Sequence, residues 1–290
     1  MIRLSEKIGQ LIRAVAICPP PTQPSTVCVQ LLSRRLHIVT NLKKYPSKTF
    51  IHNHPKLYLM EKPRFKLSPS SINVMLDCPR CFWLQLTKKI RRPSGPFPSL
   101  PNGMDRILKE HFDRFMEKGL LPPELSSHEC IGGCSLFNDK EKLKVWRSNF
   151  KGIEYFDKAS GVLLRGAVDN LLIKGKTLTV LDYKTRGFPL KEDTHEHYRL
   201  QMDIYNFLLR KNGYKTSDKS YLLFYYPNSV NAGGEVIFET RLVPLKVNTE
   251  NGEKMFRKAV KLLDSDTPPE PSKECQFCEW ARRMTSITSE

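Results

Sequence analysis

The chain of 290 residues is long enough for one sizeable α/β domain with appendages, and too short for two full domains. Its shares of hydrophobic residues (40%) and charged residues (27%) are ordinary for a globular protein, and no apolar run has the length of a membrane span. The net charge of +17 favours a polyanionic partner, with nucleic acid ahead of an anionic membrane surface.

Residues 1–60 differ in composition from the expected folded domain, residues 61–290. They carry nine Lys and Arg side chains and a single acid, so almost half of the net positive charge lies here, and charge alone indicates nucleic-acid binding only weakly. Because they show no sustained periodicity, we expect a disordered extension, or a stretch that precedes a true start at Met60. An Arg-rich, acid-poor stretch also resembles an organellar transit peptide, although this one is longer and richer in proline. Cys18 and Cys28 fall here and are assigned no role.

Two helices are expected at the start of the folded domain. Ser68 is a good N-cap followed by Pro69 in the first turn, which predicts a helix that runs to about Leu86. A proline-rich loop leads to a second helix at about residues 102–118. Its apolar stripe has helical spacing and comprises Met104, Ile107, Leu108, His111, Phe112 and Phe115. Residues 120–150 have a mixed pattern that predicts no particular element.

Residues 162–185 have the pattern of a β-hairpin. Two β-rich runs, VLLRGAVDNLLI and TLTVLDYKT, flank a turn at Lys174-Gly175-Lys176. The pattern after the hairpin predicts, in order, a helix at residues 195–211, strands at Ser220–Tyr226 and Val236–Val247, and a helix at residues 249–263. Strands bracketed by helices, with a hairpin in the middle, predict a mixed sheet of the α/β (α+β) class.

Two carboxylates and a lysine are expected to meet on this hairpin. Asp182 and Lys184 are two residues apart on one strand, so their side chains share a face, and hairpin pairing can bring Asp169 beside Asp182. Clustered carboxylates can hold Mg²⁺, which activates water and neutralises phosphate charge, while a lysine can stabilise the charge of the transition state. The alternative is an ordinary Asp–Lys ion pair at a strand end, because so short a motif also occurs by chance.

Three motifs in order resemble the RecB-like branch of the PD-(D/E)XK nuclease superfamily. They are Arg165-Gly166-Ala167-Val168-Asp169, Leu181-Asp182-Tyr183-Lys184-Thr185 and Gln201-Met202-Asp203-Ile204-Tyr205. They match that branch's G-x-x-D strand, D-x-K strand and Q-x-x-x-Y helix, and the resemblance covers roughly residues 65–280. It implies a restriction-endonuclease-like core in which helices flank a mixed central sheet.

The resemblance implies roles for individual residues. By this resemblance Asp169 and Asp182 would be metal ligands together with the Tyr183 carbonyl, and Lys184 would be the catalytic lysine. Gln201 and Tyr205, one helical turn apart, contact DNA or support the site; a polar pair at a packed helix surface is the alternative.

The family often adds a metal ligand from an early helix. His111 is the best candidate because it lies in the apolar stripe, and Glu110, off that stripe, is a weaker one. A core histidine is the alternative. The family's G-x-x-x-H spacing is missing, since Gly103 lies eight residues before His111.

Four cysteines form two C-x-x-C pairs, Cys78/Cys81 and Cys275/Cys278. The chain is too long for a secreted disulfide framework, and prolines interrupt its only early apolar stretch, so a reducing compartment and a bound metal or cluster are expected. Iron–sulfur nucleases of the RecB-like branch join their termini with a [4Fe-4S] cluster, which the resemblance therefore implies here. Zn²⁺ is one alternative, because two cysteines precede the nuclease core and two follow it, where that branch commonly has one and three. Four structural thiols without a metal are a second alternative. Cys130 and Cys134 are alternative ligands.

The expected function is a Mg²⁺- or Mn²⁺-dependent deoxyribonuclease, an exonuclease or an enzyme acting on single strands or duplex ends. The expected partner is DNA, with no membrane, and the expected setting is cytoplasmic DNA repair, or an organelle if residues 1–60 belong to the protein. Two alternatives remain: a non-catalytic nucleic-acid- or partner-binding module on the same fold, and a zinc-ribbon-like interaction protein.

Overall fold

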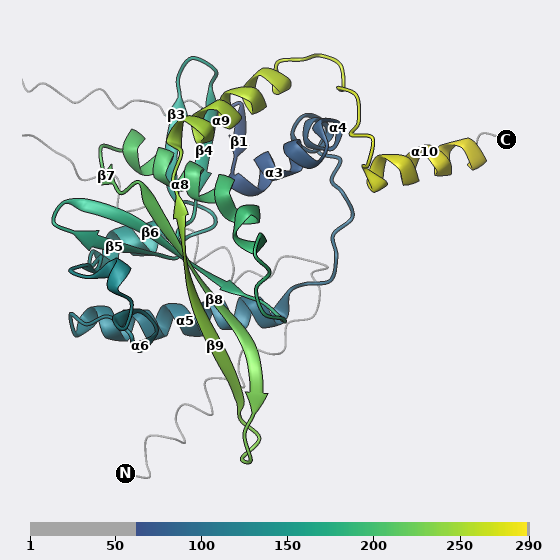
Figure 1. The fold of residues 1–290 in the computed structure, drawn as a ribbon. Helices are drawn as coiled ribbons and strands as arrows, with labels where there is room; N and C mark the ends of the chain where they lie inside the picture. The colour runs from purple at the N-terminus through teal and green to yellow at the C-terminus, as the bar shows by residue number, and fades with distance from the viewer. Residues whose placement is uncertain (1–61, 289–290) are drawn as a thin grey trace, which may run out of the picture. The chain divides into compact units, whose positions relative to one another are not determined.

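The computed structural model describes residues 62–288, so the expectations for residues 1–60, with Cys18 and Cys28, lie outside this part. Figure 1 shows the fold. The strands are β1 (Phe65–Leu67), β2 (Ser135–Leu136), β3 (Ile153–Asp157), β4 (Val162–Gly166), β5 (Asn170–Lys174), β6 (Thr177–Thr185), β7 (Lys215–Thr216), β8 (Lys219–Val230) and β9 (Val236–Lys246). The α-helices are α3 (Pro69–Asp77), α4 (Pro79–Trp83), α5 (Ser99–Glu117), α6 (Pro123–Ser126), α7 (Lys140–Trp146), α8 (Arg199–Lys211), α9 (Thr249–Leu263) and α10 (Gln276–Thr288).

A mixed sheet runs in the order β2-β5-β6-β8-β9 through the described part of the chain, and β7 pairs with β6 outside this order. β5 and β6 form the predicted antiparallel hairpin, which turns at Gly175 with a φ of 59°, a left-handed value that favours glycine. β6 pairs in parallel with β8, and β8 pairs antiparallel with β9. β8 and β9 confirm the two strands predicted after the helix at residues 195–211. The strand that carries Asp182 and Lys184 therefore lies inside this sheet.

The first run of the predicted hairpin is two strands instead of one. β4 ends at Gly166 and belongs to a separate sheet of order β1-β4-β3, whereas β5 begins at Asn170 in the mixed sheet. The three residues between them have other partners: the Val168 N–H donates to the Trp146 carbonyl, and Asp169 turns its side chain toward β6. The prediction of one continuous strand was wrong at this junction, which is where Asp169 lies.

Helices cover both faces of the mixed sheet. Leu178 and Val180 of β6 pack in a core that contains the buried face of α8, while Leu181 and Tyr183 pack in a second core that contains Leu108, Phe112 and Met116 of α5. Alternate β6 side chains therefore point to opposite helices, as the period of a strand requires. A mixed sheet flanked by helices confirms the predicted α+β, restriction-endonuclease-like fold.

The early helices differ in detail from the prediction. Ser68 caps α3 in a capping box with Ser71, as its sequence indicates, but the helix ends at Asp77 and α4 starts at Pro79. A π-helical turn, Leu84–Lys88, completes this segment. α5 begins at Ser99, three residues earlier than expected. The interruption at Cys78 fits Pro79, whose ring disfavours a helical conformation in the residue before it.

The C-terminal half follows the expected order. A 3₁₀ turn (Thr194–Tyr198) leads directly into α8, and α9 has the predicted bounds with Asn248 as its N-cap. α10 was not predicted, and it buries none of its residues. No helix in residues 62–288 combines the length and apolar character that a membrane span needs.

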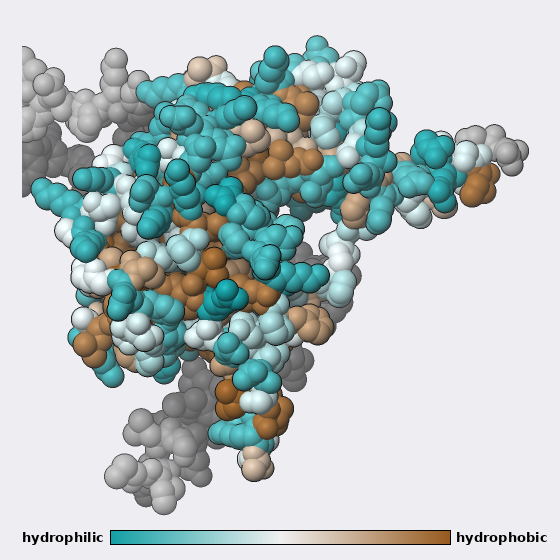
Figure 2. All heavy atoms as spheres, viewed as in Figure 1, coloured by the Kyte–Doolittle hydropathy of each residue, from teal (hydrophilic) through white to brown (hydrophobic). Residues whose placement is uncertain are grey.

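The β8–β9 hairpin extends beyond the rest of the mixed sheet (Figure 1). Its outer end exposes Val230, Val236 and Ile237, and Figure 2 shows hydrophobic residues there as well as over the middle of the molecule.

Candidate active site and cysteine cluster

Asp182 and Lys184 form a buried ion pair on the α8 side of β6. The Asp182 side chain is only 2% exposed and that of Lys184 16% exposed. The Lys184 ammonium also lies 4.7 Å from the centre of the Tyr198 ring. Because burying charge is costly unless the charge is paired or bound to metal, so enclosed a pair indicates more than an ordinary surface interaction.

Asp169 joins this pair from the junction of β4 and β5. Its Oδ2 atom accepts a hydrogen bond from the Tyr183 backbone N–H at 3.0 Å, which fixes the carboxylate beside the strand that carries Asp182. The Asp169 side chain is 17% exposed, so the site is more accessible to solvent on this side than at Asp182. The two carboxylates and Lys184 thus come together as the sequence predicts.

Gln201 connects the lysine and the carboxylate from α8. Its Oε1 accepts from Lys184 Nζ at 3.2 Å, and its Nε2 donates to Asp182 Oδ1 at 3.3 Å and to the Tyr205 hydroxyl at 2.7 Å. Gly166 allows this packing, because a Cβ atom there would lie 2.8 Å from carbons of the Tyr205 ring. The G-x-x-D motif therefore needs a glycine at this position, because α8 lies directly against β4 and leaves no room for a side chain.

Burial and charge set the protonation of the pair. Burial raises the pKa of Asp182, against the attraction of the neighbouring Lys184. Burial lowers the pKa of Lys184, but the carboxylates of Asp182 and Asp169 outweigh it and the net direction is upward, so the lysine holds its proton. Oδ2 of Asp182 contacts the ammonium and has no further partner among the described residues. A buried carboxylate oxygen with this free capacity, beside a second carboxylate, fits a hard divalent cation.

α5 contributes two charged residues to the site that the sequence reading missed. Lys109 Nζ lies 3.1 Å from Asp169 Oδ1 and 2.7 Å from Asp105 Oδ1, so one ammonium links both carboxylates. The available signal was their i,i+4 spacing on the same side of the helix as Leu108 and Phe112.

His111, the predicted early-helix ligand, faces elsewhere. Its Nε2 lies 2.9 Å from Oε1 of Glu124, which also accepts from the Tyr225 hydroxyl at 2.7 Å. Glu110 pairs with Arg106 at the surface. The side of α5 that reaches Asp169 is thus occupied by Lys109 and Asp105, and this geometry does not support His111 as a ligand.

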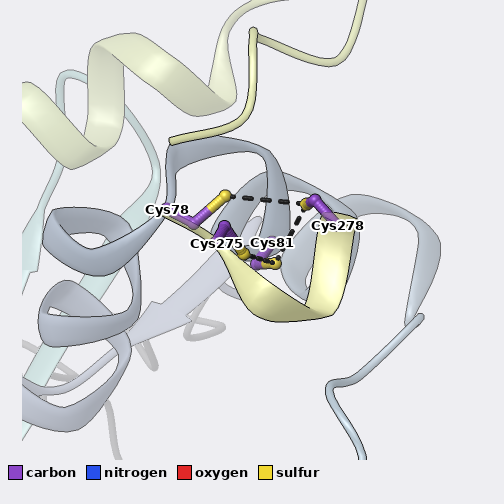
Figure 3. Close-up of side chains that lie close together, drawn as sticks. All are labelled: Cys78, Cys81, Cys275 and Cys278. Carbon is purple, nitrogen blue, oxygen red and sulfur yellow. Dashed lines mark hydrogen bonds between the residues drawn. The ribbon is translucent and has the colours of Figure 1, made fainter. Parts of the chain in front are cut away.

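The four cysteines of the C-x-x-C pairs come together in a single cluster (Figure 3). Cys78 and Cys81 lie at the start of α4, and Cys275 and Cys278 at the start of α10. The Sγ–Sγ distances are 3.8 Å for Cys78–Cys278, 3.5 Å for Cys81–Cys275 and 3.6 Å for Cys81–Cys278. All four sulfurs lie within 4.8 Å of one another, so the sequence pairs do form one site. Cys130 and Cys134 are not part of this group.

The surroundings of the cluster favour a thiolate at Cys78, whereas burial raises the pKa of Cys81 and Cys278. Burial raises the pKa of Cys78, but hydrogen bonds from the backbone of Cys81 and Ser272 outweigh it and lower the pKa to about 7. The Arg92 guanidinium lies 3.9 Å from Cys275 Sγ and places a positive charge beside the sulfurs. Deprotonated sulfur is the form that binds metal.

Comparison with known proteins agrees with this geometry. The family model of the PD-(D/E)XK nuclease superfamily matches residues 66–283, a range that holds both the carboxylate–lysine site and the cysteine cluster. A search of curated proteins gave no match.

Proposed function

The chain belongs to the PD-(D/E)XK nuclease superfamily, and on this premise we propose that it is a divalent-metal-dependent nuclease that hydrolyses DNA phosphodiester bonds in single strands or at duplex ends. One observation carries the proposal: the buried Asp182–Lys184 pair with Asp169 beside it and Gln201 connecting its two members. Because enclosing a charged pair costs desolvation, its presence favours a catalytic role over a non-catalytic module.

Asp169 and Asp182, with the Tyr183 carbonyl, are the residues we propose to hold Mg²⁺ or Mn²⁺. Asp105 takes the early-helix position expected for His111, because it shares Lys109 with Asp169. An ion held by these residues would activate a water and neutralise charge on the phosphate. Lys109 keeps the like-charged Asp105 and Asp169 close together.

Lys184 has the transition-state role in this proposal. Its ammonium stays protonated in the field of the carboxylates and can donate to the phosphate oxygen on which negative charge builds up. Gln201 positions Lys184 by accepting a hydrogen bond from one of its three N–H groups, and the Tyr205 hydroxyl in turn accepts a hydrogen bond from Gln201. Gln201 and Tyr205 are thus positioning residues, and the rigid α8–β6 packing reduces the reorganisation needed in the reaction.

For the cysteine cluster we propose one structural Zn²⁺ ion in place of the expected [4Fe-4S] cluster. Sulfurs at about 2.3 Å from a tetrahedral Zn²⁺ lie about 3.8 Å apart. Three of the sulfur pairs are 3.5–3.8 Å apart and all four sulfurs lie within 4.8 Å of one another, which supports one shared ion. In a cubane cluster each thiolate binds a different iron, which places the sulfurs farther apart. Such a thiolate site fits a reducing compartment, so we propose a cytoplasmic setting.

The test is cleavage of labelled single- and double-stranded DNA by the full chain with Mg²⁺, Mn²⁺ or EDTA. We expect metal-dependent cleavage, and a loss of about 100-fold or more in kcat for Lys184→Ala, as for removal of one transition-state donor. Lys176→Ala is the control. Lys176 precedes the first residue of β6, at the end of the strand opposite to Lys184, so this variant should cleave DNA at the normal rate. Cleavage by Lys184→Ala at full rate excludes the assigned site, and binding without cleavage under every metal favours a non-catalytic module.

A further inference from the structure

A cleft with a volume of about 380 Å³ opens beside the Gln201–Tyr205 pair. Its walls come from the start of α3, the loop 148–151 and the end of β4, and its inner side is formed by α8. Because Gln201 bonds both Asp182 and Lys184, the inner end of the cleft is adjacent to the proposed catalytic residues. Whatever lies in the cleft therefore lies next to the site of cleavage.

The charged side chains that line the cleft are both cationic. Lys151 and Arg165 are among the lining residues, and no aspartate or glutamate is. Within residues 62–288 neither of the two forms an ion pair; Arg165 donates to the Phe150 carbonyl, which holds the guanidinium at the loop. Two cations without an acidic partner attract a polyanion, and phosphate groups match the fork of an arginine.

Uncharged hydrogen-bonding groups complete the cleft wall. Ser68 and Ser70 stand at the first turn of α3, whose N-terminal N–H groups and dipole favour negative charge. Ser148 and Asn149 line the opposite side, and Ser148 Oγ accepts from the Phe150 and Lys151 N–H groups, which shapes the loop. Such groups suit a sugar–phosphate chain and the edges of bases.

An aromatic side chain lies on the same loop. Phe150, between Asn149 and Lys151, is 86% exposed, although burial of a phenylalanine is normally favourable. An exposed aromatic ring next to a basic groove is the combination by which proteins hold single-stranded nucleic acid, with a base stacked on the ring. In a duplex the faces of the bases are covered by their neighbours, so this ring would find no interior base to stack on.

We propose that this cleft binds a single-stranded segment of nucleic acid and leads it to Lys184 and the carboxylates. Lys151 and Arg165 contact backbone phosphates, and Phe150 stacks on a base. The cleft volume falls in the range of about 300–1,000 Å³ that suits a small molecule, which fits a nucleotide and not the width of a duplex. The proposal rests on the proposed nuclease function and names the form of its substrate.

Binding of fluorescein-labelled oligonucleotides to the full chain in EDTA tests this without cleavage. We expect a single-stranded DNA 12-mer to bind more tightly than its blunt duplex. Phe150→Ala should weaken single-strand binding by about tenfold or more, the usual effect of losing one stacked base. Phe97→Ala is the matched control, because Phe97 is 72% exposed but lies outside the loop 148–151 that borders the cleft, and this variant should bind as the wild type does.

Salt dependence tests the phosphate contacts separately. Lys151→Ala should reduce the slope of log affinity against log salt by about 0.7, as expected for one lost phosphate contact on a single strand. Lys176→Ala removes the same charge from the hairpin turn and should leave the slope unchanged. A single-stranded RNA of the same sequence forms a further arm: equal or tighter binding that still depends on Phe150 supports the cleft and identifies the strand as RNA.

The outcomes separate this proposal from the nuclease proposal. Unchanged binding by both Phe150→Ala and Lys151→Ala, or preference for the duplex, overturns the cleft even if DNA is cleaved in a Lys184-dependent way. If Phe150→Ala loses binding but the wild type does not cleave DNA with any metal, the result supports single-strand binding in the cleft and contradicts the proposed nuclease function. Because both side chains are exposed, the variants should fold, which circular dichroism can verify.

Discussion

Lys109 on α5 lies 3.1 Å from Asp169 at the junction of the two sheets, and so connects α5 to a carboxylate that is bonded to the strand carrying Asp182. Burial lowers the pKa of Lys109, but the carboxylates of Asp169 and Asp105 outweigh it and the net direction is upward. An ammonium held between two carboxylates occupies the kind of position where a metal ion finds its oxygen ligands.

This contact leads to a prediction about metal affinity. Asp105→Asn should raise the Mg²⁺ concentration that gives half-maximal cleavage by about tenfold, because a weaker ligand replaces a carboxylate. His111→Gln should leave that concentration unchanged, since His111 faces Glu124. Titration of activity with Mg²⁺ measures both variants, and the reverse ranking would return the ligand role to His111.

Gln201→Ala should lower kcat by about 10- to 100-fold, because Lys184 loses its acceptor and Asp182 a donor. Tyr205→Phe should have a smaller effect, since it removes only the contact behind Gln201. Single-turnover kinetics isolates this step from product release. A change confined to KM would indicate that Gln201 binds substrate and does not position the lysine.

Gly166→Ala should destabilise the fold by about 1–3 kcal/mol, as overpacking of a close contact does. The new Cβ would lie 2.8 Å from the Tyr205 ring and 2.9 Å from Leu208, so α8 must shift. Gly103→Ala is the matched control: it lies within α5 with nothing inside 4 Å, and should be neutral or stabilising by up to about 1 kcal/mol. Urea unfolding compares the two, and equal midpoints would contradict the proposed close approach.

Asp157 should make stability dependent on pH. Burial raises its pKa, but hydrogen bonds from Ser160 at 2.5 Å and Arg257 at 2.7 Å outweigh it, so the folded pKa lies below the unfolded value. The ionised form therefore stabilises the fold above the unfolded pKa of about 4, and this contribution disappears as pH falls through the folded pKa. Asp157→Asn should cost about 1–2 kcal/mol at pH 7 and progressively less in acid. Urea unfolding at several pH values measures the difference, and a constant difference would refute the assignment.

Metal analysis should find one zinc per chain and a colourless protein. Cys78→Ser should release the ion and destabilise the fold, because metal binding to thiolates contributes to folding. Cys130→Ser, outside the cluster, is the control and should retain the metal. Visible absorbance with iron and sulfide would instead restore the iron–sulfur assignment.

Local sequence patterns predicted those elements whose structure is determined by residues close together in the chain. The alternation of β6, the turn at Gly175 and the cap at Ser68 depend on neighbouring residues, and all three lie as predicted. The site motifs share this property, because Asp182 and Lys184 lie on one strand. Short motifs in the chain thus located most of the candidate site.

Long-range contacts explain what the sequence did not show. β1 and β3 are short and depend on pairing with β4. Because β4 pairs with these two strands, it belongs to a separate sheet and does not continue into β5 as the predicted hairpin strand did. Asp105 and Lys109 have the spacing of a surface ion pair, and only the placement of Asp169 gives them a role. The cleft is made by four separate parts of the chain, the start of α3, the loop 148–151, the end of β4 and α8, so no local pattern reveals it.

The cysteine cluster also changes the connectivity of the chain. Cys78 and Cys278 are 200 residues apart, and an ion bound between α4 and α10 would close nearly all of the matched region into one ring. A ring has fewer unfolded conformations than an open chain, and a cross-link over so long a loop is worth about 5 kcal/mol on the chain-entropy model. A single cut in any exposed loop inside that ring would leave both fragments tethered through the metal. Limited proteolysis should therefore nick the domain without separating its halves until a chelator opens the ring.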